Sequence, residues 1–156
     1  MTSAALDALT EAGIEHRVIR HGRVTSLAEA AQARGVPVPD VVKTIVVRRG
    51  DDDFLFILVP GDRVISWPKL RTLLGVSRLS MPDKATAKAA TGYERGTITP
   101  FGSTTAWPVI ADLRLRGRLV TLGAGEPGVA VAVEADPTLD ALDATVADIT
   151  DPEPGS

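Results

Sequence analysis

The chain has no cysteine, only two histidines and few aromatic residues. Without cysteine it can form no disulfide framework and can hold no thiolate nucleophile or thiolate metal site. The histidines, His16 and His21, are too poorly grouped with acids to indicate a metal site. The sequence also has no apolar run near the roughly 20 residues that span a bilayer, and no signal-peptide pattern at its start. We therefore expect a soluble protein of the cytoplasm that contacts no membrane.

The 156 residues fit one domain, which we expect at residues 1–150, followed by a loose tail at 151–156. β-Branched and aromatic runs at 41–49 and 54–59, joined by a glycine and three aspartates, predict an antiparallel hairpin. Further strands are expected at 15–20, 77–80, 107–112, 118–122 and 129–134. Capping residues and glycine stops predict helices at 3–12, 26–34, 66–74, 83–90 and 136–143. This alternation indicates a mixed α/β or α+β fold with a largely antiparallel or mixed sheet.

Charge is distributed unevenly along the chain. Residues 63–118 carry ten Lys or Arg against three acids, whereas residues 119–156 carry eight acids and no base. Within the basic segment Arg114, Arg116 and Arg118 have the same parity, so an extended backbone would present them on one side. Such a row suits nucleic-acid phosphates, and it suits equally an exposed edge strand that charge protects from aggregation. Both interpretations stay open at this point.

Lys43 lies within the apolar run 41–47, whose residues look buried on both faces of a strand. One interpretation is a side chain that extends past the end of the strand to water. The other is a buried ammonium met by a ligand or a carbonyl, which is the setting of catalytic lysines that bind or activate a substrate. Other segments of the chain have to decide between the two.

A long glycine-rich loop is expected at 91–106. Within it, Gly96 allows the backbone to approach a ligand without a Cβ in the way, and Pro100 favours an extended Thr99. The apolar side chains of the loop favour an ordered binding loop over a flexible connector.

A second glycine-rich stretch runs from Gly123 to Gly128 and matches the letters of the dinucleotide-binding fingerprint. That fingerprint requires a helix next, and here an alternation of valine and alanine typical of a strand follows instead. We interpret the stretch as a turn between two strands, whose free N–H groups can hold an oxygen atom of a ligand.

Together these segments resemble the YbaK/EbsC-type aminoacyl-tRNA deacylases, which are related to the editing domain of bacterial prolyl-tRNA synthetases. The resemblance runs from about residue 14 to residue 149 and is clearest at Val41 to Thr44, at Thr91 to Gly102 and in the glycine turn. It implies a mixed, partly barrel-like sheet flanked by helices. The implied function is that of a free-standing hydrolase that deacylates mischarged tRNA, above all tRNAPro carrying Cys, Ala or another small amino acid, without metal or organic cofactor.

The resemblance also implies roles for individual residues. Lys43 is expected to be the catalytic residue that binds and polarises the ester, with Thr44 and His21 bordering the amino-acid pocket. The aminoacylated 3′-adenosine is expected to be held by Gly96, Thr99, Pro100, Phe101, Gly102, Gly123, Ala124 and Gly125. Water, or a thiol of the substrate, would attack the ester, and Lys43 with backbone donors would stabilise the oxyanion. The implied partners are aminoacyl-tRNA and a cognate synthetase, for a chain that is a monomer or a homodimer.

Two other functions stay open. The same scaffold can serve as a non-catalytic module that binds aminoacyl-tRNA or a synthetase, and such a module would show binding without turnover. The pocket can also bind or hydrolyse a small ester or nucleotide unrelated to tRNA, and any nucleic-acid binding would then depend weakly on salt.

Overall fold

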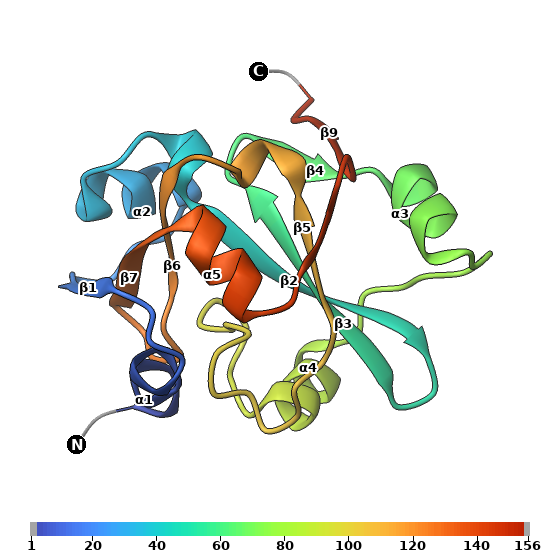
Figure 1. The fold of residues 1–156 in the computed structure, drawn as a ribbon, viewed down its shortest axis with the longest axis horizontal. Helices are drawn as coiled ribbons and strands as arrows, with labels where there is room; N and C mark the ends of the chain where they lie inside the picture. Colours follow the sequence, from blue (N-terminus) through green and yellow to red (C-terminus); the bar gives the residue numbers. More distant parts are fainter. Residues whose placement is uncertain (1–2, 155–156) are drawn as a thin grey trace.

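Three sheets lie within residues 3–154, the part of the chain that the computed structural model describes (Figure 1). Their strands are β1 (His16–Arg20), β2 (Val42–Gly50), β3 (Asp53–Pro60), β4 (Arg63–Ile65), β5 (Val109–Asp112), β6 (Leu119–Gly123), β7 (Val129–Glu134), β8 (Thr145–Ala147) and β9 (Thr150–Pro152). The strand orders are β1-β7-β6, β2-β3-β5-β8 and β4-β9. The second sheet combines the antiparallel pair β2–β3 with the parallel pairs β3–β5 and β5–β8, which confirms the expected mixed fold.

The predicted hairpin forms the two longest strands of the described residues. β2 and β3 pair from Val42 opposite Pro60 to Gly50 opposite Asp53. The turn between them includes Asp52 at φ 51°, a left-handed conformation that Asp adopts more readily than most residues. β3 is buried because β2 and β5 flank it, whereas β2 lies at the edge of its sheet. Other segments can therefore pack along the free edge of β2.

Five helices of the described residues form close to the predicted ranges, and the first four begin at the predicted capping residues. They are α1 (Ala4–Glu11), α2 (Leu27–Arg34), α3 (Trp67–Leu74), α4 (Lys84–Thr91) and α5 (Ala135–Ala141). The first four each begin at a side chain that accepts a hydrogen bond from a backbone N–H of the first turn, namely Ser3, Ser26, Ser66 and Asp83. None of these described helices has the length and apolar composition needed to cross a membrane.

The prediction fails for short strands whose pairing partners are distant in the sequence. The strand expected at 77–80 is wrong, because only Ser80 pairs, through an isolated bridge with Arg48. β4, β8 and β9 were not predicted. The loose tail expected at 151–156 is also wrong at its start, because Asp151 and Pro152 pair with β4, while residues 155 and 156 lie outside the described residues. Each of these elements has at most three residues, too few for a periodic pattern to reveal.

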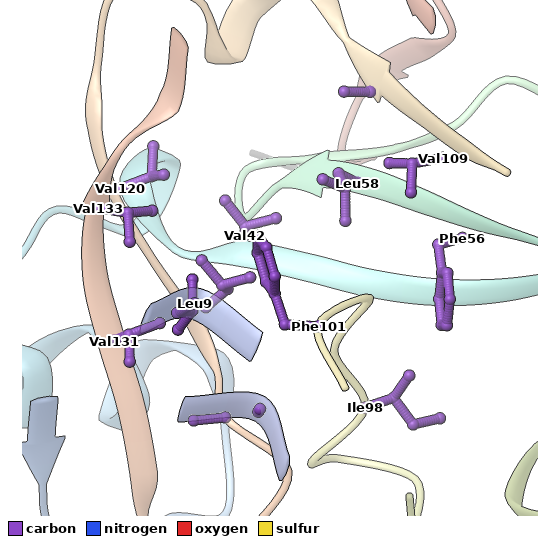
Figure 2. Close-up of a cluster of buried hydrophobic side chains, with 14 of the residues drawn as sticks. Leu9, Val42, Phe56, Leu58, Ile98, Phe101, Val109, Val120, Val131 and Val133 are labelled. Atoms are coloured by element: carbon purple, nitrogen blue, oxygen red, sulfur yellow. The ribbon is translucent and has the colours of Figure 1, made fainter. Parts of the chain in front are cut away.

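The core lies on both faces of the four-stranded sheet because side chains alternate along its strands. One face carries Val42, Phe56 and Leu58, which Figure 2 shows in a cluster with α1 and β7. The other face carries Leu55 and Ile57, which pack with α3. The predicted loop after α4 contributes to the first cluster, and this contribution holds it in an ordered conformation.

The first and second sheets meet at a seam between β2 and β6, where Val41 forms a parallel bridge with Thr121. The seam gives the two sheets their partly closed arrangement. α2 lies beside it, as Figure 1 shows at the upper left. The start of β2, which carries Lys43, is therefore enclosed by a helix, a second sheet and the loop after α4.

Candidate functional site

A cavity of about 420 Å³ lies at this seam, a volume within the range of small-molecule sites. β2 contributes Lys43 and Thr44, the loop after α4 contributes Gly96 and Ile98, and β6 ends in it at Gly123. α2 and the segment before it form the remaining wall, with Val24, Thr25, Ser26, Leu27, Ala30 and Arg34. The structure thus brings one part of each of the three predicted segments to a single cavity, although they lie up to 80 residues apart.

Lys43 is only partly buried. Its Nζ donates a hydrogen bond to the carbonyl oxygen of Arg63, at the start of β4. Burial lowers the pKa of the ammonium, while the charges of Glu153 and Asp62 act in the opposite direction. The ammonium is thus met by a carbonyl within the fold, while the residue itself lines the cavity, and the catalytic role of Lys43 stays a prediction.

Thr44 presents a hydroxyl group whose oxygen is buried and has no partner among the described residues. The residue lines the cavity and also an adjoining hollow of about 130 Å³ that reaches Met81 and Arg95. A buried hydroxyl without a partner costs stability. The contact of Thr44 with a ligand stays a prediction.

The loop after α4 is ordered by contacts with the rest of the core. The Tyr93 hydroxyl donates to the carbonyl oxygen of Phe101 at 2.6 Å, and Gly125 N–H donates to the carbonyl oxygen of Thr97 at 3.0 Å. The second contact joins the loop to the glycine turn, so the two stretches form one wall of the cavity. Gly96 is exposed at φ 92°, a conformation that favours glycine.

The other predicted residues of the two stretches lie behind this wall rather than at the cavity. Thr99, Pro100, Phe101 and Ala124 are buried, and Gly102 packs so closely on Ala4 that a Cβ would lie 2.5 Å from its carbonyl carbon. The expectation of free N–H groups in the turn is wrong for Ala124 and Gly125. Ala124 donates to Val129 at 3.1 Å, and Gly125 donates to Thr97.

His21 lies at the edge of the first sheet and is not among the residues that line the cavity. Its backbone N–H donates to the carbonyl oxygen of Gly128 at 2.9 Å, and its Nδ1 lies 2.8 Å from the carbonyl oxygen of Gly22. Its place beside the amino-acid pocket stays a prediction.

The expected extended row of arginines is wrong. Leu113–Leu115 forms a 3₁₀ turn, which breaks the strand parity on which the row depended. Each arginine also has an acid partner from a distant segment: Arg114 has Asp112 at 3.1 Å and Asp148 at 2.9 Å, Arg116 has Asp136 at 3.7 Å, and Arg118 has Asp40 at 3.6 Å. Their contact with nucleic acid stays a prediction. Pairing with acids argues against it, because a paired arginine offers less positive charge to a phosphate.

The sequence did not predict the place of Arg34 or of four arginines at a second hollow. Arg34 lines the cavity, and its Nη1 donates to Thr121 Oγ1 at 3.3 Å across 87 residues of chain. A second hollow, of about 550 Å³, is lined by Arg48, Arg49, Arg71 and Arg78. Arg48 and Arg49 pair with aspartates of the hairpin turn, whereas Arg71 and Arg78 have no acid partner within residues 3–154. The overall basic charge of residues 63–118 signalled only Arg71 and Arg78 of this group.

The two hollows lie along the same strand edge. The small hollow beside Thr44 extends along β2 to Val46 and to Met81, and Ser80 next to it pairs with Arg48 at the border of the arginine-lined groove. Two bridges flank this part of the edge, that of Val41 with Thr121 at the cavity and that of Arg48 with Ser80 at the groove. Within the described residues no three His, Asp or Glu side chains gather as metal ligands would, and the expectation of a reaction without metal stays a prediction.

The family model of the aminoacyl-tRNA editing domain matches residues 21–140 of the chain. Among curated proteins, the chain is 34% identical over 92 residues to a proline–tRNA ligase of Desulfovibrio desulfuricans, an alignment that covers 59% of this chain and 16% of the ligase. It is 31% identical over 102 residues to a proline–tRNA ligase of Lactobacillus helveticus, covering 65% of this chain and 18% of the ligase. The chain thus spans less than a fifth of the length of these relatives.

A solved structure of a proposed trans-editing enzyme for prolyl tRNA synthetase shares the fold. Its TM-score with this chain is 0.87 at 27% sequence identity, and the alignment covers 97% of this chain and 99% of the other.

Proposed function

Since the chain belongs to the aminoacyl-tRNA editing domain family, we propose that it is a free-standing hydrolase that cleaves the ester bond of mischarged aminoacyl-tRNA. The proposed substrate is tRNAPro carrying Cys, Ala or another small amino acid, and the proposed setting is the cytoplasm. The relatives among proline–tRNA ligases and the trans-editing neighbour support this substrate. Such an enzyme acts as a second sieve for side chains that a synthetase pocket rejects poorly.

The observation that carries the proposal is the convergence of Lys43, Thr44, Gly96 and Gly123 on one cavity. In the proposed reaction the ester carbonyl faces the Lys43 ammonium and the backbone of the loop. A water molecule adds to the carbonyl carbon, the C–O bond to the ribose breaks, and the proton of the water passes to the leaving ribose oxygen. The positive charge of Lys43 stabilises the oxyanion that forms between these steps. When the amino acid is Cys, its thiol is the alternative nucleophile.

The cavity wall favours catalysis by electrostatics over general-base catalysis. None of the described residues that line it is Asp, Glu or His. The side chains at hand are therefore two cations, Lys43 and Arg34, together with the hydroxyl groups of Thr25, Ser26 and Thr44. Positioned donors of this kind stabilise developing negative charge without any proton transfer of their own.

The tRNA backbone would extend from the cavity toward the arginine-lined groove. Arg71 and Arg78 in the arginine-lined groove have no acid partner among the described residues and are thus free to contact phosphates. The partner that we propose to share or deliver the tRNA is proline–tRNA ligase, because relatives of this chain form part of such ligases.

A specific contact favours the second candidate, a binding module without turnover. The Lys43 ammonium already donates to the Arg63 carbonyl, with the charges of Asp62 and Glu153 nearby, as a purely structural lysine would. A module of this kind would bind aminoacyl-tRNA or the synthetase and leave the ester intact.

The test follows ester loss from a panel of mischarged tRNAPro species with the wild type, Lys43→Ala and a control. The control is Lys88→Ala, because Lys88 is exposed and its ion pair within residues 3–154 is with exposed Glu94 at 3.2 Å. We expect Lys43→Ala to slow deacylation by about 100-fold or more, as removal of an oxyanion donor does, and the control to match the wild type. A wild-type rate no better than that of Lys43→Ala on every substrate would end the hydrolase proposal, and retained binding would then support the binding module.

A further inference from the structure

Two of the buried polar atoms without a partner lie at the same cavity. Among the described residues four such side-chain atoms occur, and Arg34 Nε and Thr44 Oγ1 both belong to residues of the cavity wall. Each buried polar group left without a hydrogen bond costs about 1–3 kcal/mol. Their coincidence at one hollow indicates a ligand that supplies the missing partners.

Arg34 is a cation without a counter-ion in this cavity. Among the described residues its side chain makes one hydrogen bond, from Nη1 to the neutral hydroxyl of Thr121, a residue that is itself fully buried. Burial lowers the pKa of the guanidinium, which nonetheless stays charged because its ordinary pKa is far above neutral pH. The arginines at 114, 116 and 118 differ, since each has an acid at 3.7 Å or closer.

The nearest acid on the same helix is already engaged elsewhere. Glu29 lies in the first turn of α2, whereas Arg34 lies in the last, about 7.5 Å further along the axis. The Glu29 carboxylate accepts hydrogen bonds from the backbone N–H of Thr25 at 2.6 Å and from its hydroxyl at 2.7 Å. These contacts lower the pKa of Glu29 and hold it at the start of the helix. The cavity beside Arg34 is therefore electropositive.

Only one kind of group at the end of an aminoacyl-tRNA carries the negative charge that would pair with Arg34. The carboxyl group of the amino acid is esterified and uncharged, and its α-amino group is a cation that Lys43 and Arg34 would repel. The phosphodiesters are the only anions. We propose that Arg34 binds the phosphate that precedes the terminal adenosine, so that this cavity takes a nucleotide and not merely an acylated ribose. The proposal rests on the proposed function for the identity of that nucleotide.

The bound nucleotide would then lie in one orientation in the cavity. The phosphate lies at the end of α2, and the ester lies at Lys43 and Thr44 on β2. A guanidinium presents parallel N–H groups, so a phosphate can accept from Nε while Nη1 keeps its bond to Thr121. Lysine at position 34 would supply charge without that geometry.

The test measures the binding of 5′-AMP and of adenosine by calorimetry. We expect the wild type to bind 5′-AMP at least tenfold more tightly than adenosine, and Arg34→Gln to lose this preference while its affinity for adenosine is unchanged. Arg34→Lys should keep only part of the preference. The matched control is Arg20→Gln, which removes an exposed arginine of β1 away from the cavity and should bind as the wild type does.

Three results would overturn the assignment: no measurable binding of 5′-AMP, equal affinity of the wild type for both probes, or a preference that survives in a folded Arg34→Gln. Circular dichroism establishes folding of each variant, and Arg34→Lys provides the comparison if Arg34→Gln is unfolded. A preference lost in Lys43→Ala and kept in Arg34→Gln would assign the phosphate to Lys43 instead. Deacylation without a preference for 5′-AMP defeats the phosphate site alone, and the preference without deacylation defeats the hydrolase alone.

Discussion

Two regions of the molecule carry the cations that the sequence singles out, and they differ in what surrounds those cations. At the seam between β2 and β6, Lys43 and Arg34 line a cavity whose described wall holds no acid. In the segment from Arg114 to Arg118, every arginine pairs with a carboxylate from elsewhere in the chain. The first region holds two cations at a cavity wall without an acid, whereas the second pairs its cations with acids that join separate parts of the fold.

The difference arises from partners that are far away in the sequence. Asp112 is fully buried and accepts hydrogen bonds from Arg114, from Ile149 N–H at 3.3 Å and from Thr150 Oγ1 at 3.0 Å, so it ties β5 to β9. The acids of the C-terminal third thus neutralise the basic middle of the chain here. They do not reach Arg34. Charge along the sequence therefore identifies ligand sites only after such pairing is known.

The largest expected effect on stability comes from breaking the paired region. Asp112→Asn leaves its buried neighbours with a weaker acceptor, and we expect a loss of about 3 kcal/mol in the free energy of unfolding, measured with urea. The control Asp136→Asn, on a half-exposed pair with Arg116 at 3.7 Å, should cost less than about 1 kcal/mol. Deacylation per folded molecule should stay within about twofold of the wild type. A loss of activity in fully folded Asp112→Asn would contradict the division between the two regions.

Thr44→Val at the cavity should lower activity and leave stability intact, the opposite of Asp112→Asn. Removing a buried hydroxyl that has no partner should leave stability unchanged or slightly higher, while deacylation falls about tenfold because a ligand contact is lost. Thr97→Val is the matched control, since the Thr97 hydroxyl donates to Glu94 at 2.7 Å and its loss should destabilise by about 1 kcal/mol. Urea unfolding and ester hydrolysis measure both quantities. Unchanged activity in Thr44→Val would remove this residue from the site.

Salt dependence of tRNA binding separates the unpaired arginines from the paired ones. The logarithm of the binding constant falls with the logarithm of the salt concentration, and each lost phosphate contact makes this negative slope shallower by about one. We expect this change for Arg78→Gln in the arginine-lined groove and none for Arg116→Gln. Filter binding of tRNAPro over a range of salt concentrations provides the slopes. The reverse result would place the tRNA on the segment from Arg114 to Arg118.

The smallest expected effect is a pH dependence at Lys43. Burial lowers its pKa below the ordinary value of 10.5, so between the lowered pKa and 10.5 the unfolded chain binds more protons than the folded protein. The contribution of Lys43 to the free energy of unfolding therefore rises with pH through that window. Lys43→Met should exceed the wild type in unfolding free energy most at neutral pH, and the difference should shrink as pH approaches 10.5. A difference that grows with pH would contradict a desolvated ammonium.

Features that depend on neighbours in sequence could be predicted. The hairpin followed from its β-branched runs, and α2 followed from Ser26 at its start and Gly35 at its end. Lys43, Thr44, Gly96 and Gly123 were identified through the resemblance to the family, and the structure places all four at one cavity.

Features set by distant partners could not be predicted. Arg34 looked like an ordinary basic residue in the last turn of a helix, and its meeting with Thr121 is a property of the folded chain. Gly61 is similar, because a Cβ there would lie 2.2 Å from the carbonyl oxygen of Val38, yet no positive φ or motif distinguishes it. β4 and β9 are stabilised by each other and are too short to show a period.

An NMR titration of the ¹⁵N-labelled protein with a non-hydrolysable 3′-aminoacyl-adenosine analogue tests most directly which of the two regions binds the ligand. Amide chemical shifts report the contact residue by residue. We predict the largest changes at Lys43, Thr44, Gly96 and Gly123, together with Arg34, and none at Arg114, Arg116 or Arg118. Changes confined to the arginine segment, or absent from the cavity at saturating analogue, would contradict the site described above.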